Sequence, residues 1–174
     1  AAPSFLQFSE PNDRLIVINS ASKSFDMTGW RIGWITHPRE LGEHIAKLVQ
    51  ITTTGVPEFL QIGFIAALEN YKNFTNELRQ SLKKSRDLMF DRLMSWKQVE
   101  CCVPDAAFYA FFKVKDMNDS LEFAKKLIVQ TNVGVAPGIA FGDSGEGHLR
   151  ICFAAKENFI YEIMNRLEPV LNKK

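Results

Sequence analysis

Residues 72–96 constrain the fold most, because apolar residues recur there at roughly helical spacing over a long stretch. The recurring residues are Phe74, Leu78, Leu82, Leu88, Leu93 and Trp96. A spacing near 3.6 residues predicts one long amphipathic helix with these side chains as core positions. We expect this helix to connect a first part of the chain to a second part with different patterning.

The part before this helix predicts alternating strands and helices, as in an α/β arrangement. Residues 15–18, LIVI, form a continuous apolar run, which predicts a strand buried on both faces. Residues 31–36, RIGWIT, predict a second strand, and Pro38 is placed to begin a helix. Residues 57–68 are apolar all round. They predict a helix buried in a core or against a partner chain, with Thr52–Thr54 as possible caps.

The part after the long helix predicts a small α+β unit. Residues 106–114 form an aromatic-rich run typical of a strand, and Ser120 can cap a following helix. Two further short strands, VGVAPG and HLRICFA, flank the glycine-rich turn GIAFGDSGEG. The predicted inner faces are Leu121, Ala124, Leu127 and Ile128 in this helix, and Phe159, Ile163, Leu167 and Leu171 in the closing helix.

The charge balance excludes some classes of partner. The 174 residues carry 21 basic and 20 acidic side chains, so a formal net charge of +1 gives no general case for binding nucleic acid or an anionic membrane. No apolar run reaches the ~18 residues that span a bilayer, and the first ten residues lack a secretory signal pattern.

Three cysteines without C-x-x-C spacing predict free thiols in a reducing compartment, the cytoplasm. The histidines show no metal-ligand spacing, which predicts no metal site.

A lysine lies in the serine-rich stretch NSASKSFDMTGWRIGW, residues 19–34. Ser20, Ser22 and Arg31 supply two hydroxyls and a guanidinium, which are donors that suit a phosphate dianion. Beside them, Lys23 can form a Schiff base with a carbonyl compound that the phosphate holds in place. This chemistry suits a phosphorylated aldehyde, of which pyridoxal phosphate (PLP) is the common one.

The same residues also have plainer interpretations. A lysine in a polar loop is usually a solvated surface charge, and Arg31 on a strand could equally be an edge charge that discourages aggregation. Gly29 and Gly33 permit close approach of a ligand or of neighbouring backbone. The S-x-x-K pattern of Ser20 and Lys23 occurs in serine acyl-enzymes, but the sequence lacks the S-D-N and K-T-G elements of those enzymes.

Two segments resemble class I/II aminotransferases, which are fold-type I PLP enzymes. Residues 20–34, SASKSFDMTGWRIGW, are similar to the family's lysine signature. Residues 135–154, VAPGIAFGDSGEGHLRICFA, are similar to its C-terminal segment, in which a PG…FG turn precedes a strand with the substrate arginine. The resemblance implies an α/β fold. Residues 1–70 would be the C-terminal part of the large PLP-binding domain, ending its sheet, and residues 71–174 an α+β small domain.

The resemblance also implies the roles of the residues around the cofactor. Lys23 would form an imine with PLP and, once substrate displaces it, move a proton between the substrate Cα and the cofactor. Arg31 would pair with the PLP phosphate, helped by Ser20 and Ser22.

At the substrate, the resemblance implies that Arg150 grips the α-carboxylate in a bidentate manner, which orients the Cα–H bond. Phe141 would line the substrate side of the pocket. The implied reaction transfers an amino group from an L-amino acid to a 2-oxo acid. The implied assembly is a homodimer in which each subunit completes the other's site.

The position of the lysine departs from the family pattern, because only 22 residues precede Lys23. Family members carry further cofactor-binding residues upstream: an aspartate at the pyridine nitrogen, an aromatic residue on the ring, and an asparagine and a tyrosine at the phenolic oxygen. None of these can be placed in residues 1–22. We therefore expect a C-terminal half that binds PLP weakly and does not transaminate by itself. The alternative is a folded, non-catalytic remnant that acts as an interaction module.

Overall fold

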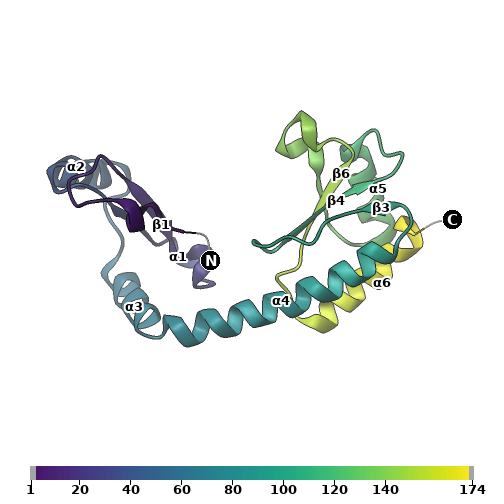
Figure 1. Cartoon of the computed structure of the whole chain (residues 1–174), viewed down its shortest axis with the longest axis horizontal. Helices are drawn as coiled ribbons and strands as arrows, with labels where there is room; N and C mark the ends of the chain where they lie inside the picture. The colour runs from purple at the N-terminus through teal and green to yellow at the C-terminus, as the bar shows by residue number, and fades with distance from the viewer. Residues whose placement is uncertain (1–2, 173–174) are drawn as a thin grey trace. The chain divides into compact units, whose positions relative to one another are not determined.

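The computed structural model describes residues 3–172, which divide between Asn76 and Glu77 into two compact units (Figure 1). Unit 1 ends at Asn76 and unit 2 begins at Glu77, and both contain helices and strands. Among the described residues, no helix combines the length and the apolar character that crossing a membrane requires. The assignment of residues 1–70 and 71–174 to a large and a small domain stays a prediction.

Unit 1 contains a two-stranded antiparallel ribbon. Strand β1 (Val17–Ser20) pairs with β2 (Gly33–Thr36), with Ser20 opposite Gly33. A Cβ at Gly33 would lie 2.5 Å from the Asn19 carbonyl oxygen, so only glycine allows this approach of the two backbones. The expected close approach at this glycine is confirmed.

The first predicted strand is displaced and is not buried. It begins at Val17 instead of Leu15, and its Ile18 side chain is 76% exposed. A ribbon of two strands presents both faces and both outer edges. The buried cluster of unit 1 is too small to cover them, so the prediction of burial on both faces is wrong for this chain.

Helices precede, separate and follow the two strands along the chain, and most of these helices are short. The α-helices are α1 (Ala21–Ser24), α2 (Gly42–Thr52) and α3 (Glu58–Glu69). The 3₁₀ turns are η1 (Phe5–Phe8), η2 (Thr28–Trp30) and η3 (Arg39–Leu41). Pro38 precedes η3, which leads directly into α2, so the predicted start of a helix at this proline is confirmed.

The prediction for α3 is wrong in two respects. Thr52 and Thr53 do not cap it, because their hydroxyls donate to the carbonyls of Leu48 and Val49 and so belong to the end of α2. Within the chain α3 is also not buried, since Phe64 is its one buried side chain among the described residues. Phe59, Ile62, Ile65 and Leu68 of α3 are exposed, because the described residues of unit 1 do not cover them.

Helix α4 (Tyr71–Ser95) confirms the long helix, but only its second half contributes to a core. Its buried residues are Ser85, Met89, Phe90 and Leu93, and Trp96 is buried just beyond its end. Phe74 is exposed, so its prediction as a core position is wrong. The first turns of α4 lack a sheet to pack on, whereas the last turns pack on the sheet of unit 2.

Unit 2 is built on a four-stranded antiparallel sheet in the order β3–β4–β6–β5. The strands are β3 (Val99–Glu100), β4 (Tyr109–Val114), β5 (Ala136–Pro137) and β6 (His148–Cys152). Side chains alternate across the sheet, so Ala110, Phe112, Val114, Leu149 and Ile151 are buried. The outer face carries their neighbours in sequence. This arrangement confirms the small α+β unit.

Two helices complete the core with α4: α5 (Ser120–Thr131) and α6 (Glu157–Leu171). Their buried residues are Ser120, Ala124, Leu127 and Thr131 in α5, and Ile160, Met164, Leu167 and Leu171 in α6. Leu121, Ile128 and Phe159 are exposed, which corrects their prediction as inner-face residues, because each lies about a quarter-turn from the buried stripe.

The N-terminus of α5 differs from the prediction by one residue. Asp119 is the cap, and its Oδ1 accepts a hydrogen bond from the Glu122 amide at 2.9 Å. Ser120 is instead the first helical residue and is buried. Its hydroxyl accepts a hydrogen bond from the Ile139 amide instead of capping the helix.

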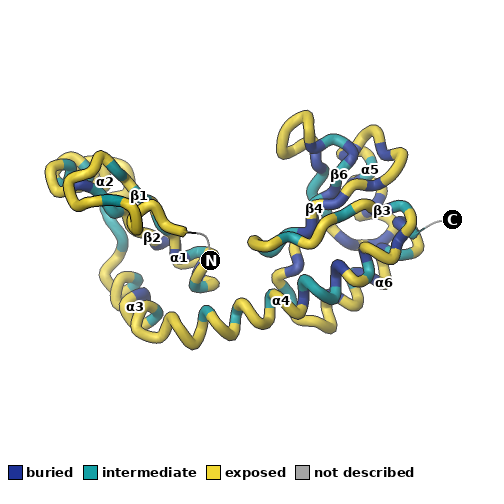
Figure 2. The backbone as a smooth tube through the Cα atoms, viewed as in Figure 1, coloured by how far each residue is buried: buried dark blue, intermediate teal, exposed yellow. Residues whose placement is uncertain are grey.

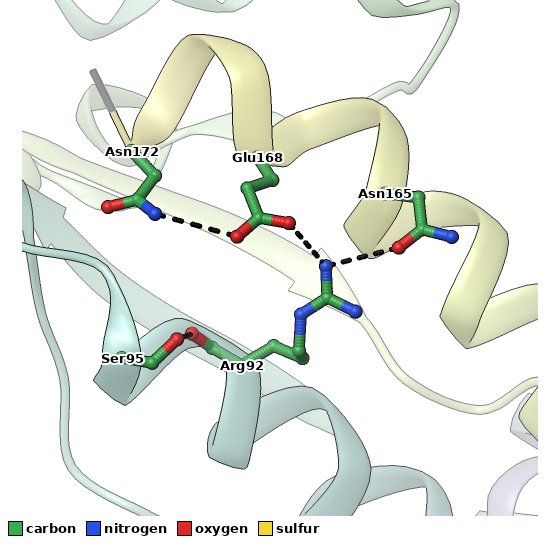
Figure 3. A network of polar contacts seen from close by, with 5 residues as sticks. All are labelled: Arg92, Ser95, Asn165, Glu168 and Asn172. Atoms are coloured by element: carbon green, nitrogen blue, oxygen red, sulfur yellow. Dashed lines mark hydrogen bonds and ion pairs between the residues drawn. The ribbon is translucent and has the colours of Figure 1, made fainter.

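Arg92 ties α4 to α6 (Figure 3). Its Nη2 donates to Oε2 of Glu168 at 2.6 Å and to Oδ1 of Asn165 at 3.1 Å. Because the charged pair is partly exposed, we expect it to add only modestly to stability.

Candidate active site residues

Lys23 lies on a single turn of helix directly after β1. Ser20 caps this turn, since its Oγ accepts a hydrogen bond from the Ser22 amide at 3.1 Å. The Phe25 amide closes the turn on the Ala21 carbonyl. The Lys23 side chain is exposed and makes no hydrogen bond or ion pair with residues 3–172. What the sequence predicts as a loop is therefore an ordered turn that presents a lysine amine.

Arg31 is not on a strand, which corrects the prediction. It ends η2 in the left-handed region, with φ 51°, and its Nη1 donates to the Thr28 carbonyl at 3.0 Å. The tight turn of η2 has to reverse the chain before β2 can begin, so pairing starts only at Gly33. Arg31 is thus a turn residue. One nitrogen of its guanidinium is bound to the Thr28 carbonyl, and the residue is exposed.

The ribbon brings the Lys23 turn and the Arg31 turn together. The Ala21 amide donates to the Ile32 carbonyl at 3.1 Å, and the buried Ala21 and Ile32 side chains belong to one cluster. Ser20, Ser22, Lys23 and Arg31 are therefore carried by two adjacent turns at the same end of the ribbon.

The chemistry of this donor set fits the groups of PLP. Ser20 uses an oxygen lone pair as a cap, which leaves its O–H free to donate, and Ser22 and Arg31 add a hydroxyl and a guanidinium. These are donors for a phosphate, and the unpaired amine of Lys23 is the group that reacts with an aldehyde.

Arg150 belongs to unit 2, on the outer face of the sheet in the middle of β6. Its Cζ lies 4.3 Å from the centre of the Tyr109 ring and 4.1 Å from the centre of the Phe141 ring. The side chain is half-buried, and residues 3–172 provide it with no carboxylate and no hydrogen bond. A guanidinium held by rings but without a counter-ion can bind a carboxylate at its free edge.

Phe141 reaches Arg150 from the loop formed by η4 (Gly138–Phe141) and η5 (Asp143–Gly145). The backbones of Gly138 and Gly145 touch, since a Cβ at Gly138 would lie 1.9 Å from the Gly145 carbonyl oxygen. Glycine at both positions is therefore a condition for this compact loop.

Ser120 and Glu146 anchor this loop to α5. The Ser120 Oγ accepts a hydrogen bond from the Ile139 amide at 3.2 Å. Oε1 of Glu146 accepts bonds from the amides of Gly147 and Ser120 at 2.8 and 2.7 Å. These amide donors, that of Gly147 first, lower the pKa of the Glu146 carboxyl below its ordinary value. The loop that carries Phe141 is thus fixed at both of its ends.

Further aromatic residues lie close to Phe141 or to Arg150, and sequence patterns alone do not identify them as site residues. The Phe111 ring stands edge-on to Phe141 at 6.0 Å and stacks on the His148 ring at 4.9 Å. Tyr109 contacts the Arg150 guanidinium, and the sequence predicts it only as part of an aromatic-rich strand. Its signal was the strand alternation, because Tyr109 and Phe111 share the outer face with Arg150 once β4 and β6 are paired.

Comparison with known proteins assigns the chain to a family. The model of the family described as aminotransferase class I and II matches residues 1–167. The chain belongs to this family. Because the match extends over both units, the Lys23 turn and the Arg150 strand both lie within the family's shared region.

Curated relatives agree with this assignment. The chain is 35% identical to an aspartate aminotransferase of Pyrococcus abyssi, over 93% of the chain and 42% of that relative. It is 35% identical to aromatic-amino-acid aminotransferase 2 of Thermococcus litoralis, with the same two coverages. A probable N-acetyl-LL-diaminopimelate aminotransferase of Bacillus subtilis is 34% identical. The chain thus spans less than half the length of these relatives.

Solved structures show the same fold. The aspartate aminotransferase of Thermotoga maritima matches with a TM-score of 0.83 and 32% identity, over 98% of this chain and 44% of that one. The aromatic aminotransferase of Pyrococcus horikoshii gives a TM-score of 0.82 at 33% identity, over 90% and 42%. The fold is therefore that of part of an aminotransferase, as the sequence predicts.

Proposed function

We propose that the protein to which these residues belong catalyses the PLP-dependent transfer of an amino group from an L-amino acid to a 2-oxo acid. The observation that carries this proposal is the Lys23 turn. An unpaired lysine amine, two serine hydroxyls and a guanidinium are held on adjacent turns within the region that matches the family. When bound, PLP supplies an aldehyde and a conjugated ring that accepts electrons from the substrate Cα.

The residues of unit 1 would hold the cofactor and move a proton. Ser20, Ser22 and Arg31 would donate to the phosphate, and Nζ of Lys23 would hold the aldehyde carbon. Once released by substrate, the Lys23 amine would accept the proton from the substrate Cα and return it to the cofactor side. A positioned base of this kind contributes about 10²–10⁴-fold to a rate.

The residues of unit 2 would orient the substrate. The free edge of Arg150 would bind the α-carboxylate, and Phe141 would line the adjoining wall. The named relatives act on amino acids with different side chains, whereas an α-amino and an α-carboxylate group are common to all of them. Arg150 is assigned to the common carboxylate.

The proposed enzyme would have two domains, form a homodimer and be located in the cytoplasm. Residues 1–70 would be the C-terminal part of the large PLP-binding domain and residues 71–174 the small domain, with the division observed within α4 as support. A homodimer would cover the apolar side chains that α3 exposes, among them Phe59, Ile62 and Ile65. Three unpaired cysteines suit the cytoplasm.

The exposed apolar surface of unit 1 also favours the second candidate, a non-catalytic interaction module. The two candidates differ in colour. A lysine joined to PLP absorbs in the near ultraviolet or visible range, and a module without the cofactor does not.

Replacing Lys23 tests the proposal in the natural full-length protein that contains these residues. Lys23→Ala should lower transamination by at least about 100-fold, because both the cofactor attachment and the base are lost. Lys47→Ala, at an exposed lysine of α2, is the matched control and should keep wild-type activity. A Lys23→Ala protein that keeps most of its kcat would contradict the assigned role.

The same experiment has an arm for residues 1–174 expressed alone. This chain should bind PLP weakly and show no turnover, since each lost charged hydrogen-bond partner costs about 1.5–3 kcal/mol. Micromolar binding with Lys23-dependent turnover would show that residues 1–174 suffice. A colourless, inactive full-length protein would instead favour the interaction module.

A further inference from the structure

Two aromatic rings hold the Arg150 guanidinium. Its Cζ is 4.3 Å from the Tyr109 ring centre and 4.1 Å from the Phe141 ring centre. Among the described residues, Tyr109 and Phe141 make no ring contact with each other, so they approach the guanidinium from different directions. The N–H groups of Arg150 donate to no residue in 3–172 and remain available to a ligand.

The backbone of Tyr109 is fixed by the strand that carries Arg150. Tyr109 pairs with Cys152 in the β4–β6 ladder, and the Phe108 carbonyl before it accepts a hydrogen bond from the Phe153 amide at 2.9 Å. Arg150 is therefore the diagonal neighbour of Tyr109 on the outer face, a distance that long side chains bridge. The position of the Tyr109 ring relative to Arg150 follows from sheet register.

Burial in the core does not explain Tyr109. Its sequence neighbour Ala110 faces the core, and the Tyr109 side chain lies on the opposite, outer face. Its hydroxyl makes no hydrogen bond to residues 3–172. The ring contacts are to Phe108 and to the Arg150 guanidinium. Tyr109 therefore contacts Arg150 through its ring and not through its hydroxyl.

The two rings at Arg150 are supported by different elements. Phe141 is backed by Phe111, which in turn stacks on His148, and its loop is tied to α5. Tyr109 is carried by β4, and its ring also contacts Phe108. Among the described residues, Tyr109 and Phe141 are the rings that contact the Arg150 cation, so loss of Tyr109 would free the guanidinium to move toward that side.

We propose that Tyr109 is a positioning residue for Arg150, which holds the guanidinium in place to bind the α-carboxylate of the substrate. This inference rests on the proposed function. A cation–π contact holds a guanidinium against an aromatic ring, and a guanidinium held in this way can offer a carboxylate two parallel N–H donors. Tyr109 thereby favours ligands that carry a carboxylate.

The kinetic test replaces Tyr109 in the natural full-length protein. Tyr109→Leu should raise KM about fivefold to tenfold for both the amino acid and the 2-oxo acid, with kcat within about twofold. Tyr109→Phe keeps the ring and should behave as wild type. Tyr161→Leu, at an exposed tyrosine of α6, is the matched control. Tyr109→Met removes the ring and supplies a more flexible apolar side chain, and it replaces Tyr109→Leu if that variant does not fold.

A substrate without a carboxylate separates positioning from general damage. With a simple primary amine as donor, Tyr109→Leu and the wild type should react at the same rate, because no group remains for Arg150 to bind. An equal loss with this amine, a fall in kcat without a rise in KM, or an unchanged KM would each overturn the inference. None of these results bears on whether the protein is a transaminase.

A second measurement does not depend on turnover. Relaxation of the Arg150 ¹⁵Nε–H group should report an ordered side chain in the wild type and in Tyr109→Phe, and a more mobile one in Tyr109→Leu. An inactive wild type would refute the proposed function while this measurement still decides the role of Tyr109. Equal Arg150 mobility in all three proteins would overturn the inference even if transamination is found.

Discussion

Unit 1 and unit 2 carry their candidate residues on very different supports. The buried cluster of unit 2 draws on a sheet and three helices and includes fully buried Trp96 and Phe112. The buried cluster of unit 1 consists of Ala21, Met27, Ile32 and Phe64. Figure 2 shows the same contrast along the chain, with buried residues concentrated after the middle of α4. The Arg150 group therefore rests on a core of its own, and the Lys23 turn on a ribbon with little buried support.

This difference has an energetic meaning. Burying a large apolar side chain stabilises a fold by roughly 1.5–3 kcal/mol, and unit 2 collects many such contributions whereas unit 1 leaves most of its large side chains in water. We expect unit 2 to fold cooperatively and unit 1 to open at low cost. Variants that act on one unit can sharpen or break this comparison.

The largest effect is expected from a core truncation in unit 2. Phe112→Ala should lower the free energy of unfolding by about 3–5 kcal/mol, because Phe112 is fully buried between β4 and the helices. Ile51→Ala in unit 1 is the control, and it should cost less than about 0.5 kcal/mol because that side chain is 82% exposed. Amide exchange of β6 and of α2 measures the two effects. Similar losses at both sites would break the comparison.

A smaller loss of stability is expected from a Cβ added where two backbones touch. Gly138→Ala should cost about 1–3 kcal/mol, since the added Cβ would collide with the Gly145 backbone in unit 2. Gly29→Ala in unit 1 adds the same atom where nothing lies within 4 Å, and should change stability by less than about 0.5 kcal/mol. Thermal unfolding of both variants gives the measurement. A neutral Gly138→Ala would show that the Phe141 loop is more adaptable than its close contact indicates.

The smallest effect depends on pH. The pKa of Glu146 is lowered in the folded state, mainly by the Gly147 amide and then by Ser120, so Glu146 stabilises unit 2 fully above the unfolded-state pKa of about 4.3. This contribution is lost as pH falls through the lowered folded pKa. Glu146→Gln should therefore lower Tm at pH 6 and converge with the wild type in acid. Glu77→Gln, at an exposed carboxylate of α4, is the control. A Tm difference independent of pH would contradict the assignment.

Sequence reasoning found the elements whose signals are local and repeated. The long helix, the aromatic strand and the closing helix follow from periodicity, and the family resemblance follows from two distinctive motifs. Errors arose where tertiary context decides. Leu15–Ile18 has the composition of a buried strand, yet burial requires covering elements that the described residues of unit 1 lack.

Errors also arose where a single residue ends one element and begins the next. Arg31 follows a strand-like pattern, but the η2 turn forces it into the left-handed region. Ser120 and Asp119 are both good caps, and only the packing of the Phe141 loop on Ser120 decides between them. Tyr109 could not be chosen among so many aromatic residues until the register of β4 and β6 placed it beside Arg150.

The anchoring of the Phe141 loop on α5 has a consequence for the order of folding. The contacts of Ser120 with Ile139 and with Glu146 join residues 19 and 26 positions apart, whereas the contacts of Ser85 with Ala155 and of Arg92 with Glu168 join residues 70 and 76 positions apart. Because a shorter loop costs less entropy to close, we expect the Ser120 contacts to form before those longer-range contacts. Loosening them should then slow folding more than it speeds unfolding. The wall beside Arg150 would thus be among the first parts of unit 2 to assemble.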